Sequence, residues 1–490
     1  MTMAGELQLI IPEIIVASVA AGVLLISVFS SRDNRWLVIL LALAGNLAAA
    51  AYSLQYLTIE PTEIFSGQIT IDRFTVYFRF IFLIVSAAAL MLAVDQLERI
   101  PFPEFASIVL FSTVGMMLLA GATDLIMIFV AVELMAIPVY VLTAFTRFRR
   151  VSTEAAIKYF TLGAFATAIL AYGMAWTYGL TGATGLRAIS AALTEHESDP
   201  SAAVLLALGL VLVAVAFKIA VVPFHVWTPD AYDGAPTPIS AFMSVGPKIA
   251  AMAMLVRIVG IAFEPLAENV QVLLYTLAAI TIIAGNIWAV QQTNIKRMLA
   301  YSSIAHSGYM LAGIAAASVV DGDLVFIGFH TLLYYALAYA LMNVGAFAVV
   351  FYVEKQTDSV AISAFRGLAQ RAWMPALMMT IFMLSLTGVP PLAGFFGKLF
   401  VIQVLVTSDL SWLAVTLAIG SVVSAYYYLR VIVYMFMSAP DPEIADAPAR
   451  SLSDSMPAVI LVAGVGTVAL GIFSNWLYEL AVDGVTLAAL

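Results

Sequence analysis

Four lysines lie inside long apolar stretches of the sequence: Lys158, Lys218, Lys248 and Lys398. A charge at the depth of a lipid bilayer costs at least about 2.5–3.5 kcal/mol, which makes such residues candidates for function. An ammonium group can lose its proton when it leaves water, whereas a guanidinium group effectively cannot. The choice of lysine therefore predicts a proton relay. Lys158, close to the start of its stretch, is a secondary candidate.

One acid lies in the middle of an apolar stretch: Glu133, in DLIMIFVAVELMAIPVYV. Alone it would stay protonated, but beside a lysine it would ionise, and each charge would stabilise the other. We expect Lys218 to be its partner. The alternative is an unpaired, neutral glutamic acid in a contact between helices.

Two histidines, His225 and His306, are secondary candidates for steps between the lysines, because imidazole both gives and takes a proton near neutral pH. The alternative for each is a ring that bonds a backbone carbonyl. His330 has no assigned role, and His196 lies in a polar loop.

The composition indicates the kind of element that must position these residues. The chain is 63% hydrophobic and 10% charged, with a mean hydropathy of +1.03, whereas a soluble domain has about 25% charged residues. It has no cysteine, which excludes disulfides, thiolate zinc sites and cysteine-bound iron–sulfur clusters. Nothing in it forms a basic stripe for nucleic acid. We expect a polytopic all-α membrane protein whose redox chemistry, if any, lies on other chains.

Apolar stretches separated by turns or charges predict fourteen membrane spans. Lys and Arg number twelve in the odd-numbered loops and two in the even-numbered loops, so the positive-inside rule places both termini outside. The predicted spans are 8–29, 36–57, 74–96, 104–121, 124–146, 153–178, 201–233, 237–260, 267–290, 296–316, 323–353, 374–407, 411–437 and 456–480.

The seventh and twelfth spans contain helix breakers, Pro223 and Pro229 in one and Pro390 and Pro391 in the other. Proline removes a backbone donor and clashes with the preceding turn, so both helices should be interrupted. The breaks are five spans apart, which predicts two inverted five-helix repeats, as in many transporters. The alternative is two unrelated proline kinks. The expected segments are 1–103, 104–262 (first repeat), 263–437 (second repeat) and 438–490.

Three arginines also lie in or near spans: Arg79, Arg257 and Arg430. Arg79 and Arg430 are close enough to a loop for the side chain to extend to the membrane surface, and Arg257 lies within two turns of a helix end. We expect mainly structural roles for them.

Four segments carry a family resemblance: TEAAIKYFTLGAFATAIL, FKIAVVPFHVWTPDAYDGAPTPISAFMSVGPKIA, NIKRMLAYSSIAHSGYML and LTGVPPLAGFFGKLF. Over about residues 100–440 the chain resembles the antiporter-like subunits of respiratory complex I, in particular subunit N (subunit 2). The sister subunit M carries glutamate in place of Lys398, and subunit L adds a long lateral helix for which this chain has no room. The three spans absent from animal mitochondrial homologues are present, which implies a prokaryotic plasma membrane or, alternatively, a thylakoid membrane.

The resemblance implies roles for the candidate residues. Glu133 matches the ion-pair glutamate of the fifth helix, and Lys218 the lysine before the break of the seventh. Lys248 matches the central relay lysine, and Lys398 the lysine that leads to the exit half-channel. Lys158 matches a lysine of the sixth helix, and two further matching positions are relay candidates, His225 and His306.

The resemblance also implies function and partners. The chain would be the proton-translocating membrane subunit of a complex I-type NAD(P)H (or ferredoxin):quinone oxidoreductase, beside an M-like subunit, small K-, J- and A-like subunits and lipid. Flavin, iron–sulfur clusters and quinone would lie on partner subunits, with no cofactor or metal on this chain. The alternatives are a subunit of a Na⁺/H⁺ antiporter or membrane-bound hydrogenase, and a scaffold whose lysines bind acidic lipids.

Overall fold

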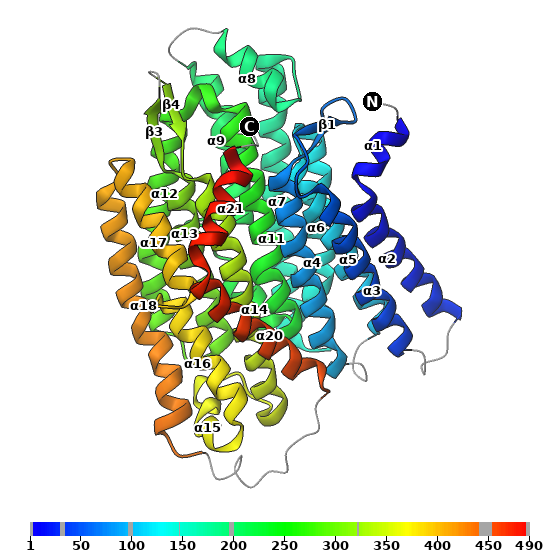
Figure 1. Cartoon of the computed structure of the whole chain (residues 1–490), viewed down its shortest axis with the longest axis vertical. Helices are drawn as coiled ribbons and strands as arrows, with labels where there is room; N and C mark the ends of the chain where they lie inside the picture. The colour runs from blue at the N-terminus through cyan, green and yellow to red at the C-terminus, as the bar shows by residue number, and fades with distance from the viewer. Residues whose placement is uncertain are drawn as a thin grey trace.

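The computed structural model describes residues 3–29, 35–96, 101–146, 148–195, 200–320, 323–440 and 453–486. Figure 1 shows a single bundle of helices running roughly along its longest axis. Within the described residues, ten helices are long and apolar enough to cross a membrane, or eleven if α1 (Met3–Leu9) and α2 (Ile11–Phe29), bent by 73°, count as one span. The chain is a multi-pass helical membrane protein.

The first part of the chain contains a buried ion pair between two of its helices. Arg79 is fully buried, and its guanidinium donates to both carboxylate oxygens of Glu13 at 2.7 and 3.0 Å. The expectation that Arg79 extends to the surface is wrong, because Glu13 supplies a counter-ion inside the bundle. After α1 and α2 come α3 (Arg35–Ser53), a 3-10 turn (Leu54–Tyr56), a hairpin of β1 (Thr62–Ile64) and β2 (Ile69–Ile71), α4 (Arg73–Ala93) and a second turn (Val94–Gln96).

The next part contains the first predicted break. The predicted seventh span is divided into α9, which ends at Lys218, and α10, which begins at Thr228. The elements are α5 (Phe102–Gly121), α6 (Leu125–Thr143), α7 (Arg150–Thr181), α8 (Leu186–Thr194), α9 (Ala202–Lys218), α10 (Thr228–Gly234), α11 (Thr237–Arg257), a π-helical turn (Ile258–Ala262) and a 3-10 turn (Glu264–Leu266).

The last part contains the second break, between α16 and α17. Residues 323–326, predicted to begin a span, instead form strand β4, which pairs with residues 317–320. The elements are α12 (Ala267–Val290), α13 (Ile295–Ile314), β3 (Ala317–Val320), β4 (Asp323–Phe326), α14 (Phe329–Thr357), a 3-10 turn (Ile362–Phe365), α15 (Leu368–Arg371), α16 (Trp373–Thr387), α17 (Ala393–Thr407), α18 (Ser411–Met437), α20 (Ser455–Ile472) and α21 (Ser474–Thr486).

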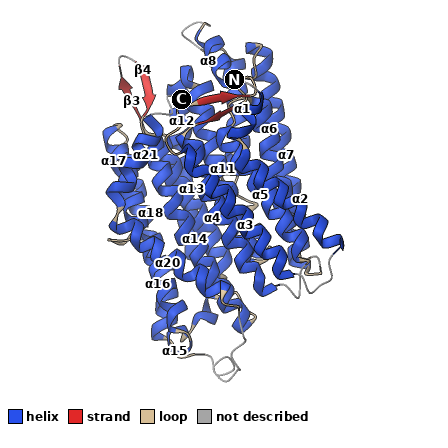
Figure 2. Cartoon of the chain, turned by 45° about the vertical axis from the view of Figure 1, so that its right-hand side comes forward, coloured by secondary structure: helices blue, strands red, loops and turns tan. Residues whose placement is uncertain are grey.

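Two helices form the centre of the bundle. Every residue of α11 is buried, and so are all but two residues of α13. Figure 2 shows both hairpins at one end of the bundle, where α8 and both ends of the chain also lie. Side chains of α11 and α13 are therefore shielded from lipid on all sides, which suits polar groups.

Two further arginines hold helix ends. The guanidinium of Arg257 donates to both oxygens of Asp72 at 2.8 and 2.7 Å and lies 4.9 Å from the centre of the Phe74 ring. Arg430 donates to the carbonyls of Val290 and Gln292 at the end of α12. Both guanidinium groups thus join the end of one helix to a neighbouring element.

Candidate functional site

The break after α9 exposes backbone groups that side chains then satisfy. The amide of Val222 donates to the hydroxyl of Thr281 at 3.0 Å. The indole of Trp227 donates to the carbonyl of Phe217, also at 3.0 Å. Irregular backbone at membrane depth requires such partners, so these side chains stabilise the interruption between α9 and α10.

Lys218, the last residue of α9, is buried and points at a tyrosine. Its ammonium donates to the hydroxyl of Tyr140 on α6 at 3.1 Å. Gly163 of α7 makes room for this tyrosine, because a Cβ at that position would lie 2.1 Å from the hydroxyl oxygen.

Glu133 lies on the same helix as Tyr140 but bonds elsewhere. Its carboxylate accepts a hydrogen bond from the hydroxyl of Thr167 at 2.6 Å. The expected direct ion pair between Glu133 and Lys218 is not formed within the described residues. Glu133 and Tyr140 are seven residues apart and share one face of α6, so the Lys218 ammonium lies about two turns along the helix from the carboxylate.

Lys248, at the centre of the buried helix α11, bonds a serine of α13. Its ammonium donates to the backbone carbonyl of Ser303 at 3.0 Å and to the Ser303 hydroxyl. The hydroxyl of Tyr232, from α10, lies 3.4 Å from the same serine oxygen. The second half of the first broken helix therefore meets α11 and α13 at one serine.

His306 lies one helical turn after Ser303 on α13 and is held at both ring nitrogens. Nδ1 lies 2.8 Å from the hydroxyl of Tyr335 on α14, and Nε2 lies 3.3 Å from that of Tyr428 on α18. The Tyr428 hydroxyl also bonds Ser302. The ring is fixed by hydroxyl groups, which can both donate and accept.

Lys398 is bonded at the second break. Its ammonium donates to the carbonyls of Leu386 and Thr387, both at 2.9 Å. These residues lie four positions before Pro390 and Pro391, and proline cannot donate to the carbonyl four residues earlier. The lysine therefore binds the two carbonyls that the two prolines leave without a helical donor.

Tyr309 lies between His306 and Lys398. Its ring centre is 5.3 Å from that of the imidazole and 4.9 Å from the Lys398 ammonium. The amide of Asn286 donates to its hydroxyl at 2.9 Å. His306, Tyr309 and Lys398 thus form a contiguous group that joins α13 to the second break.

The other two described histidines are not bonded to these residues. The ring of His225 stacks on Trp288, with ring centres 4.7 Å apart, and its Nδ1 has no hydrogen-bond partner within the described part of the chain. Nε2 of His330 lies 2.7 Å from the hydroxyl of Tyr478 in α21. His196 lies outside the described residues.

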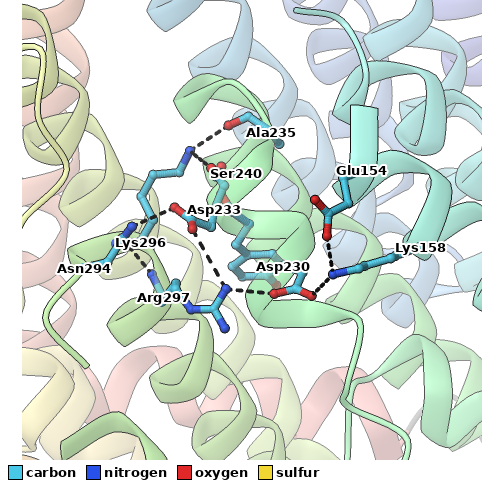
Figure 3. A network of polar contacts seen from close by, with 10 residues as sticks. Glu154, Lys158, Asp230, Asp233, Ala235, Ser240, Asn294, Lys296 and Arg297 are labelled. Atoms are coloured by element: carbon cyan, nitrogen blue, oxygen red, sulfur yellow. Dashed lines mark hydrogen bonds and ion pairs between the residues drawn. The ribbon is translucent and has the colours of Figure 1, made fainter. Parts of the chain in front are cut away.

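Lys158 lies in a separate network at the start of α7 (Figure 3). Its side chain is 48% exposed, and its ammonium pairs with Glu154 at 2.8 Å and Asp230 at 3.0 Å. Asp230 also binds Arg297 at 2.8 Å. The structure therefore does not bring Lys158 to the other three lysines.

Lys296, the first residue of the predicted span 296–316, is buried in the same network (Figure 3). Its ammonium donates to the carbonyls of Asp233 and Ala235 at 3.0 and 2.6 Å, at the end of α10. Asn294 accepts from its backbone amide and caps α13. The cation thus stabilises the C-terminal end of a short helix.

The hydroxyl partners of the candidate residues were not predicted from the sequence. The available signal was a set of tyrosines and serines inside apolar stretches that also hold lysine or histidine, as in YSSIAHSGYML. In the described residues, no group of three or more His, Cys, Asp or Glu could hold a metal ion. The partners that went unrecognised are Tyr140, Tyr232, Ser303, Tyr309, Tyr335 and Tyr428.

Residues 122–424 match a family model described as NADH:quinone oxidoreductase/Mrp antiporter, transmembrane. NADH-quinone oxidoreductase subunit N of Trichlorobacter lovleyi is 39% identical over 487 residues, which cover 98% of this chain and 97% of the relative. The chain belongs to this family. The protein of the same name from Chloroflexus aggregans is 40% identical over 473 residues, covering 95% of this chain and 94% of that relative.

Solved structures show the same antiporter-like fold. A chain of respiratory complex I from Thermus thermophilus has a TM-score of 0.79 at 33% identity and covers 96% of this chain and 99% of its own length. A chain of the Mrp complex from a Dietzia species has a TM-score of 0.85 at 23% identity and covers 98% and 97%. The second likeness shows the fold alone.

Proposed function

We propose that this chain moves protons across the membrane through three buried lysines, Lys218, Lys248 and Lys398, here called the lysine row. The observation that carries the proposal is the neutrality of their partners: a tyrosine hydroxyl, a serine and two backbone carbonyls. Within the described residues no member of the row forms an ion pair, whereas buried Arg79 and Arg257 each pair with a carboxylate. A lysine held by neutral oxygens can lose its proton without leaving a buried carboxylate unpaired.

The contacts around Lys248, His306 and Lys398 support the later part of the path, and the position of Lys218 at the first break supports its place at the start. A proton enters at the first break and reaches Lys218, then passes to Lys248, along α13 to His306, and leaves from Lys398 at the second break. Glu133 acts on Lys218 through its field rather than by contact, so a change in its charge shifts the proton affinity of the first lysine.

Two of the three secondary candidates, His225 and Lys158, stand apart from this path. His225 lies within the first break and stacks on an indole, which suits a residue at the mouth of the first half-channel. Lys158 is held in ion pairs at the surface, so we place it outside the relay.

We also infer that the chain crosses the membrane fourteen times. When α1 and α2 count as one bent span, the eleven apolar spans are joined by three further elements: the pair α9–α10, the polar helix α13, and the pair α16–α17. Two broken helices, each with a buried lysine at its break, support inverted repeats over 104–262 and 263–437, flanked by 1–103 and 438–490. Both chain ends lie at one end of the bundle, which suits an even number of spans, and we place that end on the outer side (Figure 1).

The names of the relatives support the assembly. We infer that the chain is the N-type membrane-arm subunit of an NADH:quinone oxidoreductase in a prokaryotic plasma membrane, beside M-like and smaller membrane subunits. In that enzyme it is the translocating component, and the flavin, iron–sulfur clusters and quinone are bound by other chains.

Purification of the intact complex from its own membranes tests this assignment against a Na⁺/H⁺ antiporter. We expect the complex that contains this chain to hold flavin and iron–sulfur clusters and to reduce quinone. A complex without redox centres that exchanges sodium for protons would contradict the proposal.

A further inference from the structure

One buried hydroxyl next to the lysine row has no hydrogen-bond partner among the residues that the structure describes. Tyr339 of α14 is 0% exposed, and its hydroxyl makes no hydrogen bond within the described part of the chain. Two other tyrosines of the same helix are paired: Tyr334 donates to the carbonyl of Leu470 at 3.0 Å, and Tyr335 bonds His306. An unpaired buried hydroxyl lowers the stability of the folded state by about 1–3 kcal/mol. Its presence here therefore needs an explanation, such as a role in function.

Tyr339 lies between two bonded groups of the path. Its ring centre is 5.2 Å from that of His306, and its side chain interacts electrostatically with those of Ser303, Tyr232 and Tyr428. It follows Tyr335 by one helical turn on the same face of α14. The side chain of Tyr339 therefore lies between Ser303, which bonds Lys248, and the imidazole of His306.

No hydrogen bond within the described residues joins these two groups directly. Lys248 is bonded to Ser303, and His306 is bonded to Tyr335 and Tyr428. Ser303 and His306 are three residues apart on α13, or about 4.5 Å along the helix axis, a step that one hydroxyl can span. The missing hydrogen-bond connection between Ser303 and His306 and the unpaired hydroxyl of Tyr339 therefore lie at the same place.

We propose that Tyr339 is the relay residue that carries the proton from the Lys248–Ser303 group to His306. The phenol oxygen accepts the proton arriving through Ser303 while its own proton moves toward the imidazole through the hydroxyls that bond it. The tyrosine begins and ends neutral, and the transferred proton ends on His306. This inference rests on the proposed function, because it adds one residue to that path.

Two matched variants of α14 test the proposal in the assembled complex. Tyr339→Phe removes an unpaired hydroxyl, and Tyr334→Phe removes a paired one. For Tyr339→Phe we expect an unchanged or higher unfolding temperature and a fall on the order of tenfold in protons pumped into proteoliposomes per electron. For Tyr334→Phe we expect a lower unfolding temperature and a normal proton ratio.

The opposite pattern overturns the inference: normal pumping by Tyr339→Phe, or equal loss in both variants. A second readout is 3-fluorotyrosine at position 339, which changes the acidity of the hydroxyl but little of its packing. An unchanged pumping rate with this residue also contradicts a relay role. Lys248→Ala, prepared in parallel, separates the two claims. If it stops pumping while Tyr339→Phe does not, only the inference fails; if both variants pump normally, the proposed function fails as well.

Discussion

Replacement of Lys248 by alanine is expected to lower proton pumping by the assembled complex on the order of a hundredfold. Lys248 sits on a helix that is buried along its whole length, and its ammonium is the group that bonds Ser303. Alanine fits the helix, but it offers no group that takes or gives a proton. The measurement is acidification of the lumen of proteoliposomes during NADH-driven quinone reduction.

Lys158→Ala is the matched control for this experiment, since it also removes one lysine from a helix of the bundle. Lys158 is exposed and pairs with Glu154 and Asp230, so we expect its loss to leave most of the pumping intact. Equal pumping by the two variants would show that burial in the lysine row does not decide function.

Replacement of Asp72 by alanine is expected to destabilise the fold by about 3–5 kcal/mol, because Arg257 would remain buried without a counter-ion. Asp72 also caps α4, since its carboxylate accepts from the amide of Thr75 at 2.8 Å. The measurement is the loss of unfolding free energy, followed as the unfolding temperature of the purified complex.

An exposed ion pair provides the control. Glu63 pairs with Arg187 at 3.0 Å, and both side chains are about half exposed. Glu63→Ala should therefore cost no more than about 1 kcal/mol. The double variant Asp72→Ala with Arg257→Met should recover part of the stability, because it removes the uncompensated charge. If Asp72→Ala were no more destabilising than Glu63→Ala, the structural role given to Arg257 would be wrong.

The positions of the helices were predictable to a large extent from the sequence. Most of the predicted spans overlap a helix or a broken pair, because long apolar runs and proline have local effects. Both breaks occur about four residues before a proline, where the missing amide frees a carbonyl. The strands at 317–326 were not predicted, since a short apolar β-hairpin resembles the beginning of a span.

The contacts of the candidate site were less predictable. Neighbours such as Tyr428 and Ser302 lie 126 positions apart, and nothing in the local pattern pairs them. Lys158 lies about two turns into α7, but the sequence does not specify which face of that helix turns outward. Lys296 is buried because α10 folds over the start of α13, which is a property of the tertiary structure.

The central claim is that lysines of the row lose and regain protons during turnover, and Lys218→Arg tests it most directly. Guanidinium keeps the positive charge and can still donate to Tyr140, but it does not release its proton. The measurement is the number of protons translocated per electron by the variant complex in sealed proteoliposomes. We predict a ratio below that of the unmodified complex, and an unchanged ratio would contradict the account.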